Sequence, residues 1–180
     1  MKSDGLDDLY QRGYVVHRDK TGITAGLPAA TTAPPEQSPP TAEEFEENQH
    51  EFWFEATQAP IYLARGELWP AALRQAEMRD LLLTVLEWNA AARSGGAIDT
   101  WHNGHHLQEW LPDDYHARIA PIFAQYDPAD GARAWRALID LYSDVAAETA
   151  RLAVLPRLDL KAKVLRHVDS VLHGPGDGTS

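Results

Sequence analysis

Two indoles and three imidazoles lie in one short stretch, Asp99–Pro112, between two regions of helical pattern: Trp101, His102, His105, His106 and Trp110. Imidazole and carboxylate groups suit zinc, so His102, His105 and His106, with Asp99 nearby, could form a metal cluster. Their spacing is not that of the HExxH zinc motif, and no glutamate stands in the position of its general base. We therefore predict no metal and favour an aromatic and polar wall, with Trp110 in the core.

Carboxylates form a second set of candidates. Four glutamates recur at helical spacing between Thr41 and Ala64, a stretch that contains no Lys or Arg: Glu44, Glu47, Glu51 and Glu55. Such a stripe is usually a solvated face. Glu51, close to Trp53, is the member best placed to be partly shielded, and Glu87 beside Trp88 has the same setting. Because a shielded carboxylate binds a guanidinium in bidentate fashion, these residues predict a cationic partner.

Helices must position both sets. Thr41 and Glu44 predict a capping box after Pro40, and apolar residues recur at helical spacing as far as Leu63, with Pro60 as a kink. The next region, 67–93, reads as one broken helix or two consecutive helices that glycines 95 and 96 end. A short helix should follow from 111 to 123, then a long one capped by Asp127, and a last amphipathic one over 160–172.

The remainder of the chain predicts little regular structure. Residues 14–17 form one short β-like run, followed by the turn signal Asp19–Gly22, and residues 25–40 are rich in Pro, Thr, Ala and Ser. We predict an all-α fold, an antiparallel helical bundle with a short N-terminal β-strand arm and a Pro-rich linker. The expected organisation is an arm over 1–24, a linker over 25–40, a helical domain over 41–172 and a disordered tail over 173–180.

Composition narrows the class of protein. A net charge of -11 argues against binding to nucleic acid, because phosphate contacts need Lys and Arg. The absence of cysteine excludes disulfides and thiolate metal sites. The N-terminus lacks the basic start of a signal peptide, and no stretch has the length of a membrane span, so we predict a cytoplasmic protein without a membrane partner.

Several blocks agree, in order, with one known family: Asp19–Gly22, Pro40–Phe45, Glu51–Trp53, Ala64–Trp69, Leu86–Trp88, Trp101–Trp110 and Trp135–Leu138. With Asp140–Leu141 and Glu148–Ala150, these blocks resemble aminoglycoside 6-adenylyltransferases, which adenylylate streptomycin, and the resemblance covers about residues 13–153. The resemblance covers that family's C-terminal helical domain and the last strand before it. It implies AMP transfer from Mg-ATP to a streptomycin hydroxyl in the full-length enzymes, with the helical domain supplying one wall of the cleft.

Two departures from the family shape the prediction. Its Mg²⁺ is held by a Gly-Ser turn followed by Asp-x-Asp in a preceding α/β domain, and neither motif occurs in these 180 residues. We therefore predict no catalytic residue and no cofactor bound by this chain alone. The family usually carries Arg or Lys at the position of His105, sometimes of His106, so a phosphate-facing role there is weakened.

The resemblance implies an aminoglycoside-binding surface made by Glu51, Trp53, Glu87, Trp101, His102 and His105. Trp101 and Trp110 could flank a sugar or aminocyclitol ring, or both could be core residues, as we favour for Trp110. The alternative is a non-catalytic module that binds aminoglycoside or docks onto a separate nucleotidyltransferase domain through its exposed strand and helix faces. An uncovered apolar face would favour a homo-oligomer.

Overall fold

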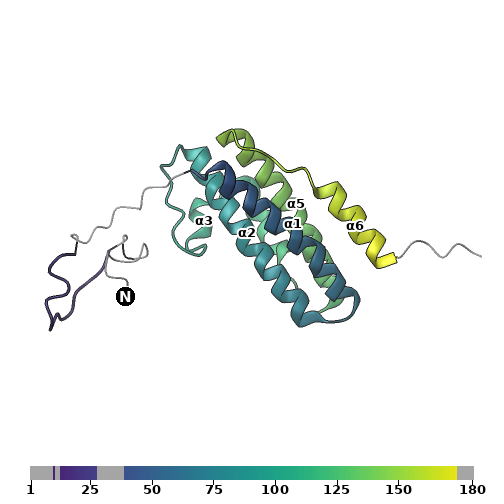
Figure 1. Ribbon diagram of the computed structural model, residues 1–180, viewed down its shortest axis with the longest axis horizontal. Coiled ribbons are helices and arrows are strands. Elements are labelled where there is room, and N and C mark those ends of the chain that lie inside the picture. Colours follow the sequence, from purple (N-terminus) through teal and green to yellow (C-terminus); the bar gives the residue numbers. More distant parts are fainter. Residues whose placement is uncertain (1–9, 11–12, 28–38, 174–180) are drawn as a thin grey trace, which may run out of the picture.

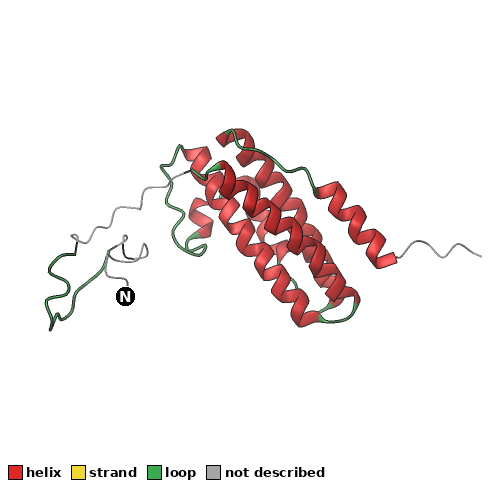
Figure 2. Cartoon of the chain, in the orientation of Figure 1, coloured by secondary structure: helices red, strands yellow, loops and turns green. Residues whose placement is uncertain are grey.

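The computed structural model describes residues 10, 13–27 and 39–173, and its body is built from helices (Figures 1 and 2). Three long helices carry most of the core, α1 (Ala42–Ala64), α2 (Leu68–Ser94) and α5 (Pro128–Ala153). Between α2 and α5 the chain forms three short elements, α3 (Leu107–Trp110), α4 (Asp113–Ile119) and the 3₁₀ turn η2 (Ala120–Ile122). The last helix, α6 (Lys161–His173), lies along the outside of the bundle.

The predicted helix boundaries are largely confirmed. The capping box at the start of α1 is present: the Glu44 amide donates to Thr41 Oγ1 at 3.2 Å, and the Thr41 amide donates to Glu44 Oε2 at 2.8 Å. The region expected as one broken helix or two is the single helix α2, which ends at Gly95 in the left-handed conformation with φ 63°. Asp127 caps α5 as expected, and α5 ends at Ala153, since Val154 turns left-handed at φ 55°.

Contacts between the long helices fix their directions. Asn48 and Glu55 of α1 pair with Leu81 and Arg74 of α2, so these helices are antiparallel. α1 is antiparallel to α5 as well, because Ala56 and Asn48 of α1 bond Trp135 and Tyr142 of α5. It follows that α2 and α5 run parallel, which the long connection through α3, α4 and η2 allows.

Pro60 lies inside α1 without ending it. A proline has no amide hydrogen, so it cannot donate to the carbonyl four residues earlier, here that of Ala56. The indole Nε1 of Trp135 donates to this carbonyl at 2.9 Å, and both residues are buried. A side chain of α5 thus replaces the backbone hydrogen bond that α1 lacks.

The centre of the core joins the three long helices through one polar chain. Tyr142 stacks on Phe52 with ring centroids 3.5 Å apart, and its hydroxyl donates to Asn48 Oδ1 at 2.7 Å. Asn48 Nδ2 in turn donates to the Leu81 carbonyl of α2 at 3.2 Å. Burial raises the pKa of Tyr142 well above its usual range, so the hydroxyl stays a donor. These bonds fix the rotation of α1 against its neighbours.

The connection to α6 is held by a side chain of α1. The Gln49 amide donates to the Pro156 carbonyl at 3.2 Å and accepts from the Leu158 amide at 2.8 Å. Lys161 Nζ then pairs with Asp140 Oδ1 of α5 at 2.7 Å. α6 is therefore fastened to the bundle at its first turn.

The predicted β-strand over 14–17 is wrong, since these residues form no strand. A strand needs a partner for its backbone groups, and the described part of the chain contains no second strand. The turn predicted over Asp19–Gly22 is present: the Asp19 carboxylate accepts hydrogen bonds from the amides of Thr21, Gly22 and Thr24 at 2.7–2.9 Å. Most of the predicted linker, 28–38, and the tail beyond residue 173 lie outside the described residues. Among the described helices, none is long and apolar enough to cross a membrane.

Candidate functional site

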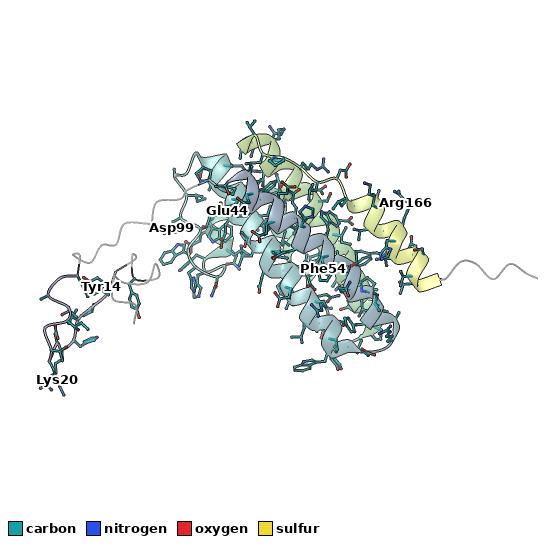
Figure 3. All side chains as sticks on the ribbon, viewed as in Figure 1. Tyr14, Lys20, Glu44, Phe54, Asp99 and Arg166 are labelled. Carbon is teal, nitrogen blue, oxygen red and sulfur yellow. The ribbon has the colours of Figure 1, made fainter. Side chains whose placement is uncertain are left out.

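A hollow of about 600 Å³ lies between α2 and the loop that follows it, lined by Asp80, Leu83, Thr84, Glu87, Trp101, His102 and Asn103. A second hollow of about 490 Å³ lies over α1 and α2, lined by Glu51, Phe54, Glu55, Arg74, Glu77, Asp80, Leu81 and Thr84. Asp80 and Thr84 line both, so the two hollows are continuous. We call the combined surface the acidic groove. Phe54, on α1 in the second hollow, and Asp99, at the base of the loop, are labelled in Figure 3.

Helical spacing brings the acidic side chains of the groove together. Glu77, Asp80 and Glu87 are three and seven residues apart on α2, so they share one face of that helix. Glu51 and Glu55 share a face of α1 in the same way. Because α1 and α2 are antiparallel neighbours, the two acidic faces line one groove.

The charge of the groove is strongly negative. It contains five carboxylates and the guanidinium of Arg74, which pairs with Glu55 at 3.1 Å. Glu51, Glu77 and Asp80 are exposed, and no described cation forms an ion pair with them. A ligand with several positive groups would therefore find unpaired carboxylates along the whole groove.

Glu87 differs from the other carboxylates of the groove because it is half-buried. Burial raises the pKa of Glu87 to about 7, since little water remains to solvate its charge. In the part of the chain described, no hydrogen bond or ion pair relieves this desolvation. A cation bound in the first hollow would favour the ionised form.

The loop beside α2 has an unusual backbone. Trp101, Asn103 and His106 have φ values of 58°, 51° and 56°, and Gly104 has 70°. Non-glycine residues with positive φ are costly and cluster at functional sites. The Trp101 amide donates to Asp99 Oδ1 at 2.9 Å, which helps to fix the turn.

Two tryptophans of this loop have opposite roles. Trp110 is buried, and its Nε1 donates to the His105 carbonyl at 2.9 Å, which ties the loop to the core. Trp101 is 43% exposed and faces the first hollow. Its ring lies 4.5 Å from that of His106, which in turn pairs with Glu109 at 3.1 Å. The predicted placement of Trp110 in the core is confirmed, whereas Trp101 is partly exposed at the first hollow.

The structure unites four of the six predicted binding residues in the groove: Glu51, Glu87, Trp101 and His102. It separates the other two. Trp53 is 4% exposed and packs against Phe52 and Tyr142 in the core. His105 is exposed but lines neither hollow. No group of three or more metal-ligating side chains occurs within the described residues.

Sequence reasoning missed Glu77 and Asp80 as groove residues, and it placed Glu55 in the acidic stripe without assigning it to a site. The signal was present as the helical spacing of acids on α2. It becomes informative only when α2 is placed against the acidic stripe of α1.

A separate polar cluster outside the groove ties α2 and α4 to α5. The Glu148 carboxylate accepts from Tyr115 Oη at 2.6 Å and from Asn89 Nδ2 and Arg93 Nε at 3.2 Å. Burial opposes ionisation of Glu148, but these hydrogen bonds prevail and hold its pKa below the usual range. The cluster is structural, since it lines neither hollow.

Comparison with known proteins gives one family and one fold. A sequence model described as streptomycin adenylyltransferase matches residues 2–171. The fold is similar to that in a crystal structure of an aminoglycoside 6-adenyltransferase from Bacillus subtilis, with a TM-score of 0.66 and 19% identity. The match covers 73% of this chain, which spans about half (51%) of the length of that protein. No curated protein sequence matches the chain.

Proposed function

The chain belongs to the streptomycin adenylyltransferase family, and from that premise we propose that its acidic groove binds an aminoglycoside substrate. The observation that carries the proposal is the row of unpaired carboxylates along α1 and α2. Aminoglycosides carry several amino or guanidino groups, and carboxylates recognise such groups through charge-assisted hydrogen bonds. We assign the main contacts to Glu51, Asp80 and Glu87.

Within this proposal the two ends of the groove have different tasks. Trp101 offers an exposed aromatic face on which a sugar or aminocyclitol ring can lie, and His102 adds a polar group beside it. Glu51 and Glu77 lie farther along α1 and α2, where they can pair with cationic groups at the other end of the ligand. The long rigid helices hold these groups in place, which lowers the entropy lost on binding.

The groove does not suit the second substrate of the family, ATP with Mg²⁺. A triphosphate would be repelled by the exposed carboxylates of Glu51, Glu77 and Asp80, and Arg74 is already paired with Glu55. No Gly-Ser turn followed by Asp-x-Asp occurs in these 180 residues. We therefore propose that these residues alone transfer no AMP, and that transfer requires a nucleotidyltransferase domain to complete the site.

Calorimetric titration with streptomycin at low salt tests the binding proposal. We expect saturable binding that Glu51→Gln and Glu87→Gln each weaken about tenfold, the loss of one charge-assisted contact. Asp140→Asn is the matched control, because it removes the same charge from α5 outside the groove. Equal weakening of binding by all three variants would show that only the net charge of the protein matters and would contradict the assigned contacts. The absence of binding by the folded wild type would refute the proposal.

A second measurement separates binding from catalysis. The purified chain, mixed with Mg-ATP and streptomycin, should release no pyrophosphate above background. Binding without turnover is the expected outcome for an aminoglycoside-binding helical half. Release that depends on both Mg²⁺ and streptomycin would contradict the proposed division of labour.

A further inference from the structure

A second cleft lies at the other end of α2, outside the acidic groove. It has a volume of about 200 Å³, and its lining includes Leu63 from α1, Arg79 from α2, and Phe123 and Tyr126 from the turn before α5. Phe123 and Tyr126 are 53% and 71% exposed. The cleft is too small for a drug-sized ligand, and its size suits one or two anchoring side chains.

Arg79 is the unusual residue of this cleft. Its guanidinium carbon lies 5.1 Å above the Phe123 ring, and the side chain is half-buried. Within the described residues it makes no ion pair and no hydrogen bond, although the chain carries 27 acidic residues. Burial lowers the pKa of Arg79 more than the nearby charge of Asp80 raises it, in keeping with a cation that has lost part of its water. A partly desolvated, unpaired guanidinium favours an anionic partner.

The rim of the cleft is rigid. Arg133 donates to the backbone carbonyls of Pro121 and Phe123 at 2.7 and 2.9 Å, and it pairs with Asp130. The Gln125 amide donates to Asp130 Oδ2 at 2.7 Å. These contacts fix the turn that carries the two exposed aromatic rings, so a partner would not have to order it.

The floor and the charge of the cleft are also fixed. Gln75 donates to the Gly131 carbonyl at 2.7 Å, which joins α2 to α5 beneath the cleft. Asp127 is the one carboxylate in the lining, and its Oδ1 caps α5 by accepting from the Asp130 amide at 2.8 Å. Asp127 is thus engaged at a helix N-terminus, which leaves the charge of Arg79 for a ligand.

We propose that this cleft docks a segment of a partner protein in which an aspartate or glutamate adjoins an aromatic residue. The carboxylate pairs with the Arg79 guanidinium, and the aromatic ring packs on Phe123 and Tyr126. Exposed aromatic residues beside an arginine are the types that dominate binding at protein interfaces. A planar guanidinium already stacked on a ring is oriented for bidentate pairing.

The test measures binding of the blocked peptide Gly-Ser-Phe-Asp-Ser-Gly to the full chain. Binding is detected by NMR, from the chemical-shift changes of the backbone amides of Ala72, Ala124 and Gln125. The matched peptide has Asn in place of Asp. We expect the Asp peptide to bind at least tenfold more tightly than the Asn peptide. In Arg79→Gln this preference should fall below twofold, and in Phe123→Ala both peptides should weaken together.

Arg136→Gln is the control variant, since Arg136 also lies over an aromatic ring, that of Trp135, but lines a different hollow. It should leave the preference unchanged. Equal binding of the two peptides to the wild type, or a preference that persists in Arg79→Gln, would overturn the proposal. So would displacement of the Asp peptide by inorganic phosphate at equal concentration, because the site would then select any small anion.

Discussion

The indole of Trp135 should stabilise the fold mainly by satisfying a carbonyl that Pro60 leaves without a donor. Trp135→Phe keeps an aromatic ring at this position and removes the Nε1 donor to Ala56, 2.9 Å away. Ala56 is 0% exposed, so water cannot replace the bond. Leaving a buried acceptor unsatisfied costs about 1–3 kcal/mol, to which the smaller ring adds a packing loss.

A double-mutant cycle separates these two contributions. In Pro60→Ala the residue at position 60 regains an amide hydrogen, which can donate to the Ala56 carbonyl along α1. The loss of unfolding free energy caused by Trp135→Phe should therefore be smaller in the Pro60→Ala background than in the wild type, by at least about 1 kcal/mol. The packing loss is the same in both backgrounds and cancels in the difference.

Urea denaturation followed by far-UV circular dichroism measures the cycle without relying on tryptophan fluorescence, which the substitution changes. Equal slopes of the unfolding free energy against urea would show that all four proteins unfold in the same manner. A coupling energy within about 0.3 kcal/mol of zero would refute the reasoning, because contacting residues that share one bond should not be additive.

Three further substitutions test other parts of the structure. Burial raises the pKa of Glu87 from 4.5 to about 7, so between these pH values the folded state holds a proton that the unfolded chain has released. The stability of the wild type should therefore fall as the pH rises from 4.5 to 7. Over the same range the melting temperature of Glu87→Gln should rise relative to that of the wild type. Gly131→Ala should change the free energy of unfolding in urea by less than about 1 kcal/mol, because its Cβ would displace only the end of the half-exposed Leu63 side chain, 2.7 Å away, while alanine favours the helix. Glu148, whose pKa is lowered in the fold, should stabilise the protein at neutral pH and lose this effect in acid; thermal melts of Glu148→Gln should thus fall below the wild type at pH 7 and approach it near pH 3.

Local sequence signals predicted the helices well because the signals are themselves local. The capping box of Thr41 and Glu44 and the glycine after α2 act within one helical turn, and both are present as predicted. The β-like run at 14–17 is also a local signal, but a strand depends on a second strand that no local pattern provides. Pattern alone therefore predicted a strand where the described chain has none.

The candidate site shows the same division. Glu51 and Glu87 were found because each is a carboxylate beside an aromatic residue, and the fold brings both into the groove. Trp53 lies two residues from Glu51 in the same block, yet its position on α1 faces Tyr142 and the core. The spacing of residues 51 and 53, two positions apart on a helix, separates them by about 200°. A matched block can thus contain one groove residue and one core residue.

The shape of the acidic groove depends on residues that line neither of its hollows. The groove needs the acidic faces of α1 and α2 to point the same way, so any rotation of α1 about its axis would separate Glu51 from Asp80. Asn48 prevents this rotation, since it bonds both Tyr142 of α5 and the Leu81 carbonyl of α2. The like charges along the groove repel one another, and the buried polar chain holds them in place until a cationic ligand neutralises them. The recognition proposed for this surface would therefore depend on the core as much as on the carboxylates that contact the ligand.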